Sequence, residues 1–77
     1  MIDQGEAKSR KMLLGLGRVV REIRKDRKLT QTQLADSAGI SQPVMSRIER
    51  GGFYSLRLLC LVAEALELEI EVNFLER

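Results

Sequence analysis

The chain has 77 residues, of which 44% are hydrophobic and 31% are charged, as in one small folded domain and unlike a disordered segment. It contains one cysteine and no histidine, which excludes an internal disulfide and argues against zinc or haem sites and against the commonest acid–base catalysis. No apolar run approaches the roughly 20 residues of a membrane span, and the N-terminus lacks the pattern of a secretory signal, so we expect a cytoplasmic protein.

Charge is distributed unevenly along the chain. Residues 1–57 contain twelve Lys or Arg and six Asp or Glu, a net charge of +6, whereas residues 58–77 contain one Arg and five Glu, a net charge of −4. This distribution favours a polyanionic partner on one side of the molecule. A basic helix face that contacts only solvent explains the same composition, so charge alone leaves both interpretations open.

The first 40 residues predict two helices. Residues 1–9 are polar and are expected to form a flexible N-terminus. Apolar residues at helical spacing, interleaved with arginines, predict a helix from about residue 11 to residue 28, and Gly15 and Gly17 place its regular start near them. Thr30 and Gln33 have the spacing of a capping box that begins a second, short helix, and Gly39 fits the left-handed position that ends it.

Two further helices are predicted in the second half. Ser41 is the expected N-cap of a third helix, with Pro43 in the first turn, where a missing N–H costs little. This helix runs to about Arg50. Ser55 is the expected cap of a fourth helix, whose inward positions are predicted to be Leu56, Leu59, Val62, Ala63 and Leu66.

Two residues near the fourth helix have alternative roles. Cys60 lies in an apolar run, which predicts a buried small side chain; a reactive thiol would need exposure and a basic neighbourhood. Tyr54 precedes the helix; its hydroxyl either donates a hydrogen bond to the polyanionic partner that the charge distribution favours, or the side chain packs against the helix.

The period changes after residue 68. Apolar and polar residues alternate strictly, which predicts a strand with Ile70, Val72 and Phe74 on one face. No other segment reads as a strand, and a lone strand is unstable in water, so we expect residues 68–77 to pair with a second copy across a two-fold axis. Centring that axis on Val72 avoids placing Glu71 opposite its own copy. A disordered tail is the alternative.

The two short helices joined at residues 39–41 have the form of a helix-turn-helix. Their motifs, in order and spacing, resemble those of the phage repressor/Cro (Xre-type) family over residues 16–67. The motifs are Leu16-Gly17, Val20-Arg21, Arg24, Leu29-Thr30-Gln31, Leu34-Ala35, Gly39-Ile40-Ser41 and Ser46-Arg47-Ile48-Glu49-Arg50-Gly51.

The resemblance implies a fold and a mode of binding. The fold is an all-α domain of four to five helices over residues 10–67, whose third helix enters the major groove of DNA. A C-terminal strand that pairs across a dimer resembles the antitoxin branch of the family. Members of that branch dimerise, repress their own operon and often bind a toxin.

Helical geometry gives the third helix an exposed face that carries Pro43, Arg47 and Arg50, opposite Met45 and Ile48. By resemblance, the base-reading positions map to Gln42, Pro43, Ser46 and Arg47, with Val44 as a further candidate. The phosphate contacts are expected at Gln31, Ser41 and Arg50; the first two lie at helix N-termini, where free N–H groups attract anions.

Two further charged residues, Arg24 and Glu49, are implied by the resemblance to form a structural ion pair, with direct DNA contact as the alternative. The link before the fourth helix lacks the basic residues that many relatives use to contact phosphate.

The sequence therefore predicts a sequence-specific DNA-binding regulator without enzymatic activity, cofactor or metal. An autoregulatory repressor that binds an inverted repeat as a homodimer is the preferred interpretation. Its expected partners are double-stranded DNA, a second copy of the chain and, as the antitoxin resemblance implies, a toxin protein; no membrane is expected. The alternative is a protein-interaction module whose main role is to bind and mask a partner protein. No nucleophile–base pair, phosphate-binding loop or ligand cluster supports an enzyme.

Overall fold

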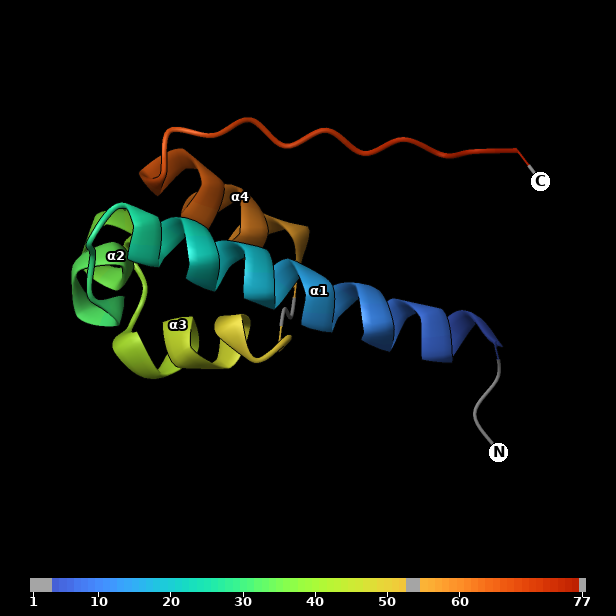
Figure 1. Cartoon of the computed structure of the whole chain (residues 1–77), viewed down its shortest axis with the longest axis horizontal. Helices are drawn as coiled ribbons and strands as arrows, with labels where there is room; N and C mark the ends of the chain where they lie inside the picture. Colours follow the sequence, from blue (N-terminus) through green and yellow to red (C-terminus); the bar gives the residue numbers. More distant parts are fainter. Residues whose placement is uncertain (1–3, 53–54, 77) are drawn as a thin grey trace.

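The computed structural model describes residues 4–52 and 55–76, and these residues form four helices joined by short turns (Figure 1). The helices are α1 (Gln4–Asp26), α2 (Gln31–Ala38), α3 (Gln42–Glu49) and α4 (Leu56–Ala65). α1 packs against α3, and α2 packs against both α3 and α4. The predicted all-α fold is thus confirmed, with four helices in the described part of the chain. None of the helices described is long and apolar enough to cross a membrane.

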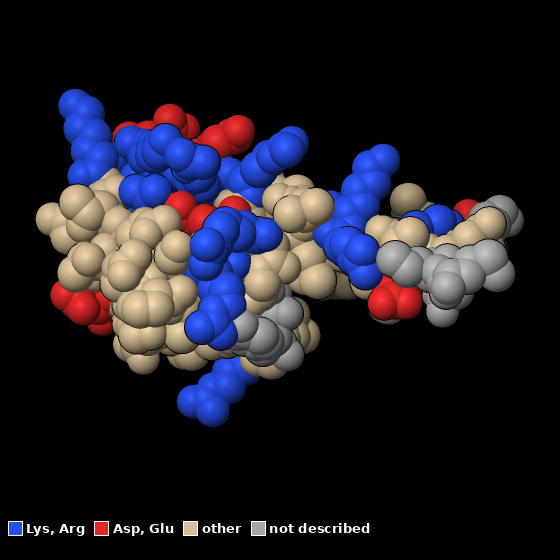
Figure 2. All heavy atoms as spheres, turned by 90° about the horizontal axis from the view of Figure 1, so that it is seen from below, with Lys and Arg blue, Asp and Glu red and all other residues tan. Residues whose placement is uncertain are grey.

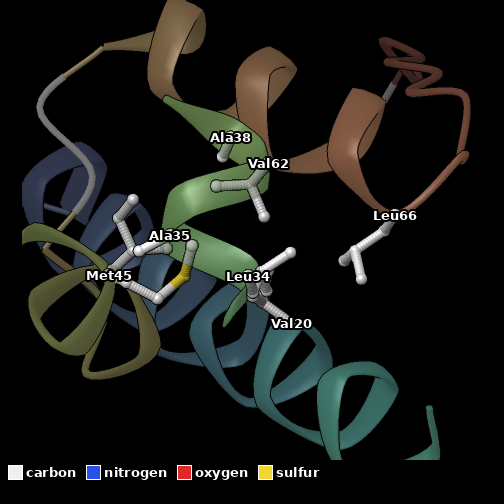
Figure 3. Close-up of a cluster of buried hydrophobic side chains, with 8 residues drawn as sticks. Val20, Leu34, Ala35, Ala38, Met45, Val62 and Leu66 are labelled. Atoms are coloured by element: carbon white, nitrogen blue, oxygen red, sulfur yellow. The ribbon is translucent and has the colours of Figure 1, made fainter. Parts of the chain in front are cut away.

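The hydrophobic core lies where α2 meets the other helices (Figure 3). Leu34 of α2 and Met45 and Ile48 of α3 are completely buried. Burying side chains of this size contributes about 1.5–3 kcal/mol each. Further residues of α2, together with residues of α1, α4 and the C-cap of α4, complete the cluster: Val20, Ala35, Ala38, Val62 and Leu66. An eight-residue helix is not stable by itself in water, so α2 and α3 depend on this core.

The turn between α2 and α3 is specified by local signals. The Thr30 hydroxyl accepts a hydrogen bond from the Gln33 amide at 3.0 Å, and the Gln33 side chain accepts one from the Thr30 amide at 2.8 Å, so the predicted capping box is present. Gly39 ends α2 with φ of 73°, a conformation that costs glycine little. Ser41 then caps α3 by accepting a hydrogen bond from the Val44 amide at 3.3 Å.

The first helix begins earlier than expected. Residues 4–9 are helical, so the predicted flexible segment is wrong for them, and residues 1–3 lie outside the described part of the chain. Glu6 and Arg10, one turn apart, form an exposed ion pair of 3.7 Å. Neither Gly15 nor Gly17 interrupts α1, because glycine weakens a helix by only about 1 kcal/mol and keeps its N–H donor.

Two apolar side chains of α4 that were predicted to be buried or to face the core are exposed. Cys60 is exposed, and Leu56 is 63% exposed. On α4, the buried face carries Val62, and Cys60 lies about 160° from Val62 around the helix axis because each residue advances about 100°. The prediction that Cys60 is buried is therefore wrong, as is the inward position of Leu56.

The chain turns after α4 and continues as an extended segment. Glu67 adopts a positive φ of 57°, and the Leu68 amide donates a hydrogen bond to the Ala63 carbonyl. Residues 68–76 then run back past α4 and along the direction of α1 (Figure 1). The described residues contain no strand, so the strand predicted around Val72 is not formed within the single chain. A strand needs a hydrogen-bonded neighbour, and no described segment supplies one.

The close approach of α1 and α3 predicts different effects for two glycines of α1. A Cβ atom at Gly17 would lie 2.7 Å from the carbonyl oxygens of Ile48 and Glu49, so Gly17→Ala is expected to lower the free energy of unfolding by about 1–3 kcal/mol. Gly15→Ala is the matched control, since a Cβ there meets nothing within 4 Å, and it should raise stability by about 0.5–1 kcal/mol. Urea denaturation followed by circular dichroism measures both. Stabilisation by both substitutions would contradict the close helix contact.

Candidate nucleic-acid interface

Helix α3 has one face in the core and one face in solvent. Met45 and Ile48 are completely buried, whereas Gln42, Pro43 and Arg47 are exposed. Pro43 lies in the first turn, where its missing N–H leaves no hydrogen bond unmade. The buried face fixes how α3 is rotated about its own axis. The residues on the opposite face are therefore the ones that a ligand can contact.

The residues predicted to read bases are not equally accessible. Gln42, Pro43 and Arg47 lie on the exposed face, and Ser46 is partly buried at its edge. Val44, the further candidate, is partly buried and packs against the core, which removes it from the exposed face.

Two of the residues predicted to contact phosphate lie at the neighbouring N-termini of α2 and α3, and the third lies at the other end of α3. Ser41 is exposed at the N-cap of α3, and Gln31 is partly buried at the first position of α2. Arg50 is exposed at the opposite end of α3, where it is the C-cap residue. Tyr54, a further candidate, lies outside the described residues.

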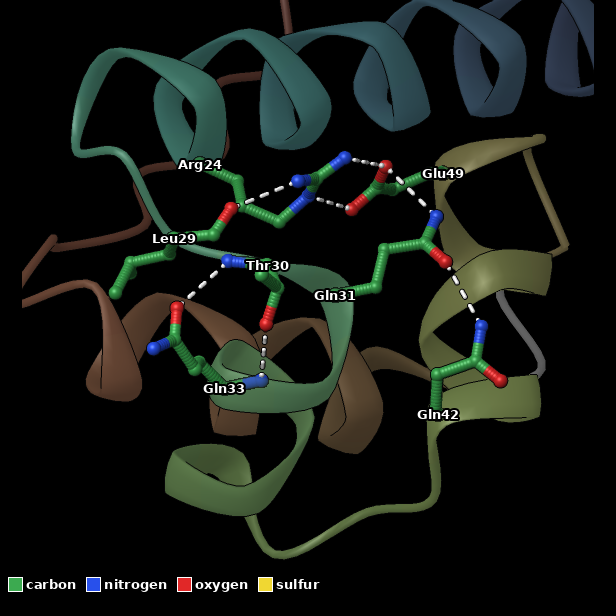
Figure 4. Close-up of polar contacts among 7 residues, drawn as sticks. All are labelled: Arg24, Leu29, Thr30, Gln31, Gln33, Gln42 and Glu49. Carbon is green, nitrogen blue, oxygen red and sulfur yellow. Dashed lines mark hydrogen bonds and ion pairs between the residues drawn. The ribbon is translucent and has the colours of Figure 1, made fainter.

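Arg24 and Glu49 form a buried ion pair between α1 and α3 (Figure 4). The Arg24 Nε donates to one carboxylate oxygen at 2.6 Å and a terminal nitrogen donates to the other at 3.0 Å, a two-pronged geometry that strengthens such pairs. The remaining terminal nitrogen donates to the Leu29 carbonyl at 2.8 Å. The two side chains are 10% and 3% exposed. This depth favours the structural role over direct DNA contact.

Opposing influences act on the pKa of Arg24 in this pair. Hydrogen bonds to Glu49 raise the pKa of Arg24 above its ordinary value, burial acts in the opposite direction, and the charge of the carboxylate adds to the increase. No buried side-chain nitrogen or oxygen among the described residues lacks a hydrogen-bond partner. The pair therefore joins α1, the loop at Leu29 and α3 without leaving a buried charge uncompensated.

Two glutamines extend this network to the exposed end of α3 (Figure 4). The Gln31 Nε2 donates to Glu49 at 3.2 Å, and the Gln42 Nε2 donates to the Gln31 Oε1 at 2.8 Å. This contact between the two glutamines was not predicted from the sequence. The signal was present, because each is the first residue of its helix, and the helix-turn-helix brings these two N-termini together.

Basic side chains lie on the side of the molecule that carries α3. Figure 2 looks at the molecule from the side on which α3 lies in Figure 1, and it shows Lys and Arg at the centre of this face and along one edge. On α1, a shallow hollow is lined by Arg18, Arg21 and Lys25 together with Glu22. These positive charges favour a polyanion over a neutral or cationic ligand.

Two short helices joined at a glycine turn, with the second one anchored in the core and exposed on its outer face, define a helix-turn-helix protein. The sequence profile of the helix-turn-helix family matches residues 20–73, and the chain belongs to this Xre-type family. The chain is also 43% identical over 56 residues to the immunity repressor protein of Bacillus phage phi105. That alignment covers 71% of this chain and 39% of the phage protein, so the chain spans about two fifths of its relative.

Breaking the buried pair on one side is expected to destabilise the fold strongly. Arg24→Met leaves the Glu49 carboxylate buried without its cation, which typically costs about 3–5 kcal/mol. The double variant Arg24→Met/Glu49→Met removes both charges and should recover most of that loss. The control is Arg10→Met in the exposed Arg10–Glu6 pair, where at most about 1 kcal/mol is expected. Urea denaturation measures all three variants. Equal losses for Arg24→Met and Arg10→Met would show that the buried pair has no special role.

Proposed function

We propose that the protein is a sequence-specific DNA-binding transcriptional repressor that places α3 in the major groove. The observation that carries this proposal is the exposed face of α3, where Gln42, Pro43 and Arg47 lie opposite the core in a member of the helix-turn-helix family. The similarity to a phage immunity repressor supports repression as the outcome of binding.

The exposed side chains have complementary roles in this proposal. Arg47 donates two hydrogen bonds to guanine O6 and N7, and Gln42 pairs its amide with adenine. Pro43 has no donor and contributes an apolar contact, such as one to a thymine methyl group, while Ser46 contacts a base at the edge of the face. Gln31, Ser41 and Arg50 hold the phosphate backbone and fix the position of α3.

We further propose that the protein acts as a homodimer through its extended C-terminal segment. Residues 69–76 make no backbone hydrogen bonds to other described residues, and the segment exposes Val72, Phe74 and Leu75, with Phe74 97% exposed. Antiparallel pairing of two such segments around Val72 would satisfy the backbone and cover apolar surface. Two recognition helices about 34 Å apart would then read an inverted repeat, at which the protein represses its own gene by occlusion.

Masking of a partner protein, such as a toxin, is the second candidate function. The exposed apolar side chains of the C-terminal segment favour it, because contiguous apolar surface of this kind marks protein contacts. The two functions are compatible, since α3 and the C-terminal segment are different surfaces.

Removal of Arg47 is expected to reduce sequence discrimination. Fluorescence anisotropy would compare the DNA upstream of the protein's own gene with an unrelated duplex at low and physiological salt. Arg47→Ala should weaken binding to the specific duplex by about 1–3 kcal/mol, the value of a two-pronged base contact. Arg47→Lys keeps the charge but loses the planar fork, so it should keep non-specific affinity and lose discrimination.

The control for that experiment is Lys8→Ala, which removes an exposed charge from the N-terminal part of α1 and should leave discrimination unchanged. Equal binding of the unaltered protein to both duplexes, abolished by salt, would indicate only a basic surface and would contradict the proposed repressor. Full discrimination by Arg47→Ala would instead remove Arg47 from the base-reading set.

The proposed register of the dimer predicts a specific cross-link. In a Cys60→Ser background, Val72→Cys should form an intermolecular disulfide under mild oxidation, because antiparallel pairing on the two-fold axis brings the two Cα atoms within about 4.5–5.5 Å. Glu71→Cys is the matched control; it faces Asn73 of the other copy in this register and should cross-link poorly. Non-reducing electrophoresis and light scattering measure the outcome. A monomer at high concentration would contradict the dimer and favour the masking function.

A further inference from the structure

We propose that the apolar groove between α1 and α4 is the docking site for the aromatic ring of Phe74 from a second copy of this chain. The inference rests on the proposed homodimer and deepens it, because it assigns a side chain and a receiving surface to the contact. Each copy would then insert one ring into the other, in addition to pairing its backbone.

The groove lies where the C-terminal segment (residues 68–76) runs back past α4 (Figure 1). Side chains of α1, α4 and the segment line it, among them Leu16, Val19, Leu59, Val62, Leu68 and Ile70. Its volume is about 230 Å³. An apolar cavity of about 150 Å³ already holds a benzene molecule, whereas one turn of a helix, about 10 Å across, is too large for this space. The groove therefore suits a single aromatic ring.

The C-terminal segment is covered at its start and exposed at its end. Leu68 and Ile70 line the groove and are each 37% exposed, whereas Phe74 is 97% exposed. These residues occupy alternate positions of an extended chain and so share one face of it. Because Leu68 and Ile70 turn this face toward the helices, Phe74 lies on the face that contacts the groove but beyond the end of the groove.

Pairing with a second copy brings a Phe74 ring back to the groove. Within one extended chain, Phe74 lies about 13 Å beyond Ile70, so its own ring is carried past the groove. Antiparallel pairing centred on Val72 places Phe74 of one copy opposite Ile70 of the other. Opposite residues share a face of the ribbon, with Cβ atoms about 4.5–5.5 Å apart. The second copy's ring is therefore delivered beside Ile70, at the groove.

The charges around the groove are compatible with this occupant. Glu69 and Glu71 contribute to its lining and disfavour an anionic ligand, whereas the ring of Phe74 is neutral. In the proposed register Glu71 faces Asn73 of the second copy, so no two carboxylates oppose each other. Val19, 49% exposed in the single chain, would be covered by the ring, and the removal of both apolar surfaces from water favours docking.

Tryptophan fluorescence tests whether the ring is buried in the dimer. The protein contains no tryptophan, so a single introduced one reports only its own surroundings. Phe74→Trp should emit at shorter wavelengths in the concentrated dimer and at longer wavelengths after dilution to monomer. Leu75→Trp is the matched control, because Leu75 is on the opposite face of the segment and should emit at long wavelength at every concentration. Light scattering on the same samples gives the oligomeric state.

Two further variants test the ring and its receiving surface. Phe74→Ala removes two buried rings per dimer and should raise the dimer Kd by about 100-fold or more. Val19→Glu places a carboxylate on the groove wall, which a docked ring would desolvate, and should weaken the dimer similarly. Leu14→Glu is the matched control, since Leu14 is also 49% exposed but lies about 140° from Val19 around α1, and it should leave the Kd unchanged.

A mixed dimer distinguishes the ring of a second copy from the ring of the same chain. A chain with both Val19→Glu and Phe74→Trp should emit at long wavelength by itself, because every groove available to it is altered. Excess unaltered chain supplies an intact groove and should move the emission to shorter wavelengths. Excess Val19→Glu chain supplies none and is the control. A ring docked in its own chain would instead leave all three samples alike.

The outcomes separate this inference from the homodimer on which it rests. If the unaltered protein stays monomeric at high concentration, the proposed dimer fails and the inference fails with it. If the protein dimerises but Phe74→Trp stays at long wavelength and Val19→Glu leaves the Kd unchanged, the dimer stands and the inference is overturned. Short-wavelength emission of Phe74→Trp in the diluted monomer also overturns it, because the ring would then be buried by its own chain. Circular dichroism of each variant confirms that folded protein is compared.

Discussion

The buried ion pair between Arg24 and Glu49 is the interaction on which the arrangement of the helices depends. It joins the C-terminal half of α1, the backbone at Leu29 and the end of α3, and it lies where α1 and α3 approach so closely that Gly17 has no room for a Cβ atom. A buried pair is not by itself a large source of stability, but either partner alone would be an uncompensated charge in the core. The two helices are therefore confined to the arrangement that keeps both charges satisfied.

The candidate recognition helix, α3, depends on its contacts with the rest of the fold. Eight residues are too few for an isolated helix, so α3 is held by the burial of Met45 and Ile48 and by its Ser41 cap. The same anchoring fixes which face is exposed. Hydrogen bonds then run outward from Glu49 through Gln31 to Gln42, so rigidity in the core extends to a side chain in solvent. One hydrogen-bond network thus contributes both to the packing of α1 against α3 and to the position of a candidate DNA-binding side chain.

The C-terminal segment differs from the helices in backbone conformation, charge and burial. It is extended and acidic, and its apolar side chains are only partly covered. Near its start, Leu68 and Ile70 line an apolar groove between α1 and α4, whereas Phe74 at the far end is almost fully exposed. All the basic residues except Arg77 precede this segment in the chain, so the proposed DNA-binding and protein-binding surfaces are formed by different parts of the sequence. Such a division suits a small protein that contacts two kinds of partner.

The sequence by itself determined the features that depend on a few neighbouring residues: the capping box at Thr30, the glycine turn at Gly39, the Ser41 cap and the helix-turn-helix they define. Predictions from the sequence placed the start of α1 too late and Cys60 in the interior, and they did not include the contact between Gln31 and Gln42. Burial and side-chain contacts depend on which distant residues cover a position, and a strand depends on a second strand to bond with. Burial, side-chain contacts and strand pairing were decided only by the tertiary structure. Hydrophobic periodicity shows which face of an element is apolar, but it does not show which residues cover that face.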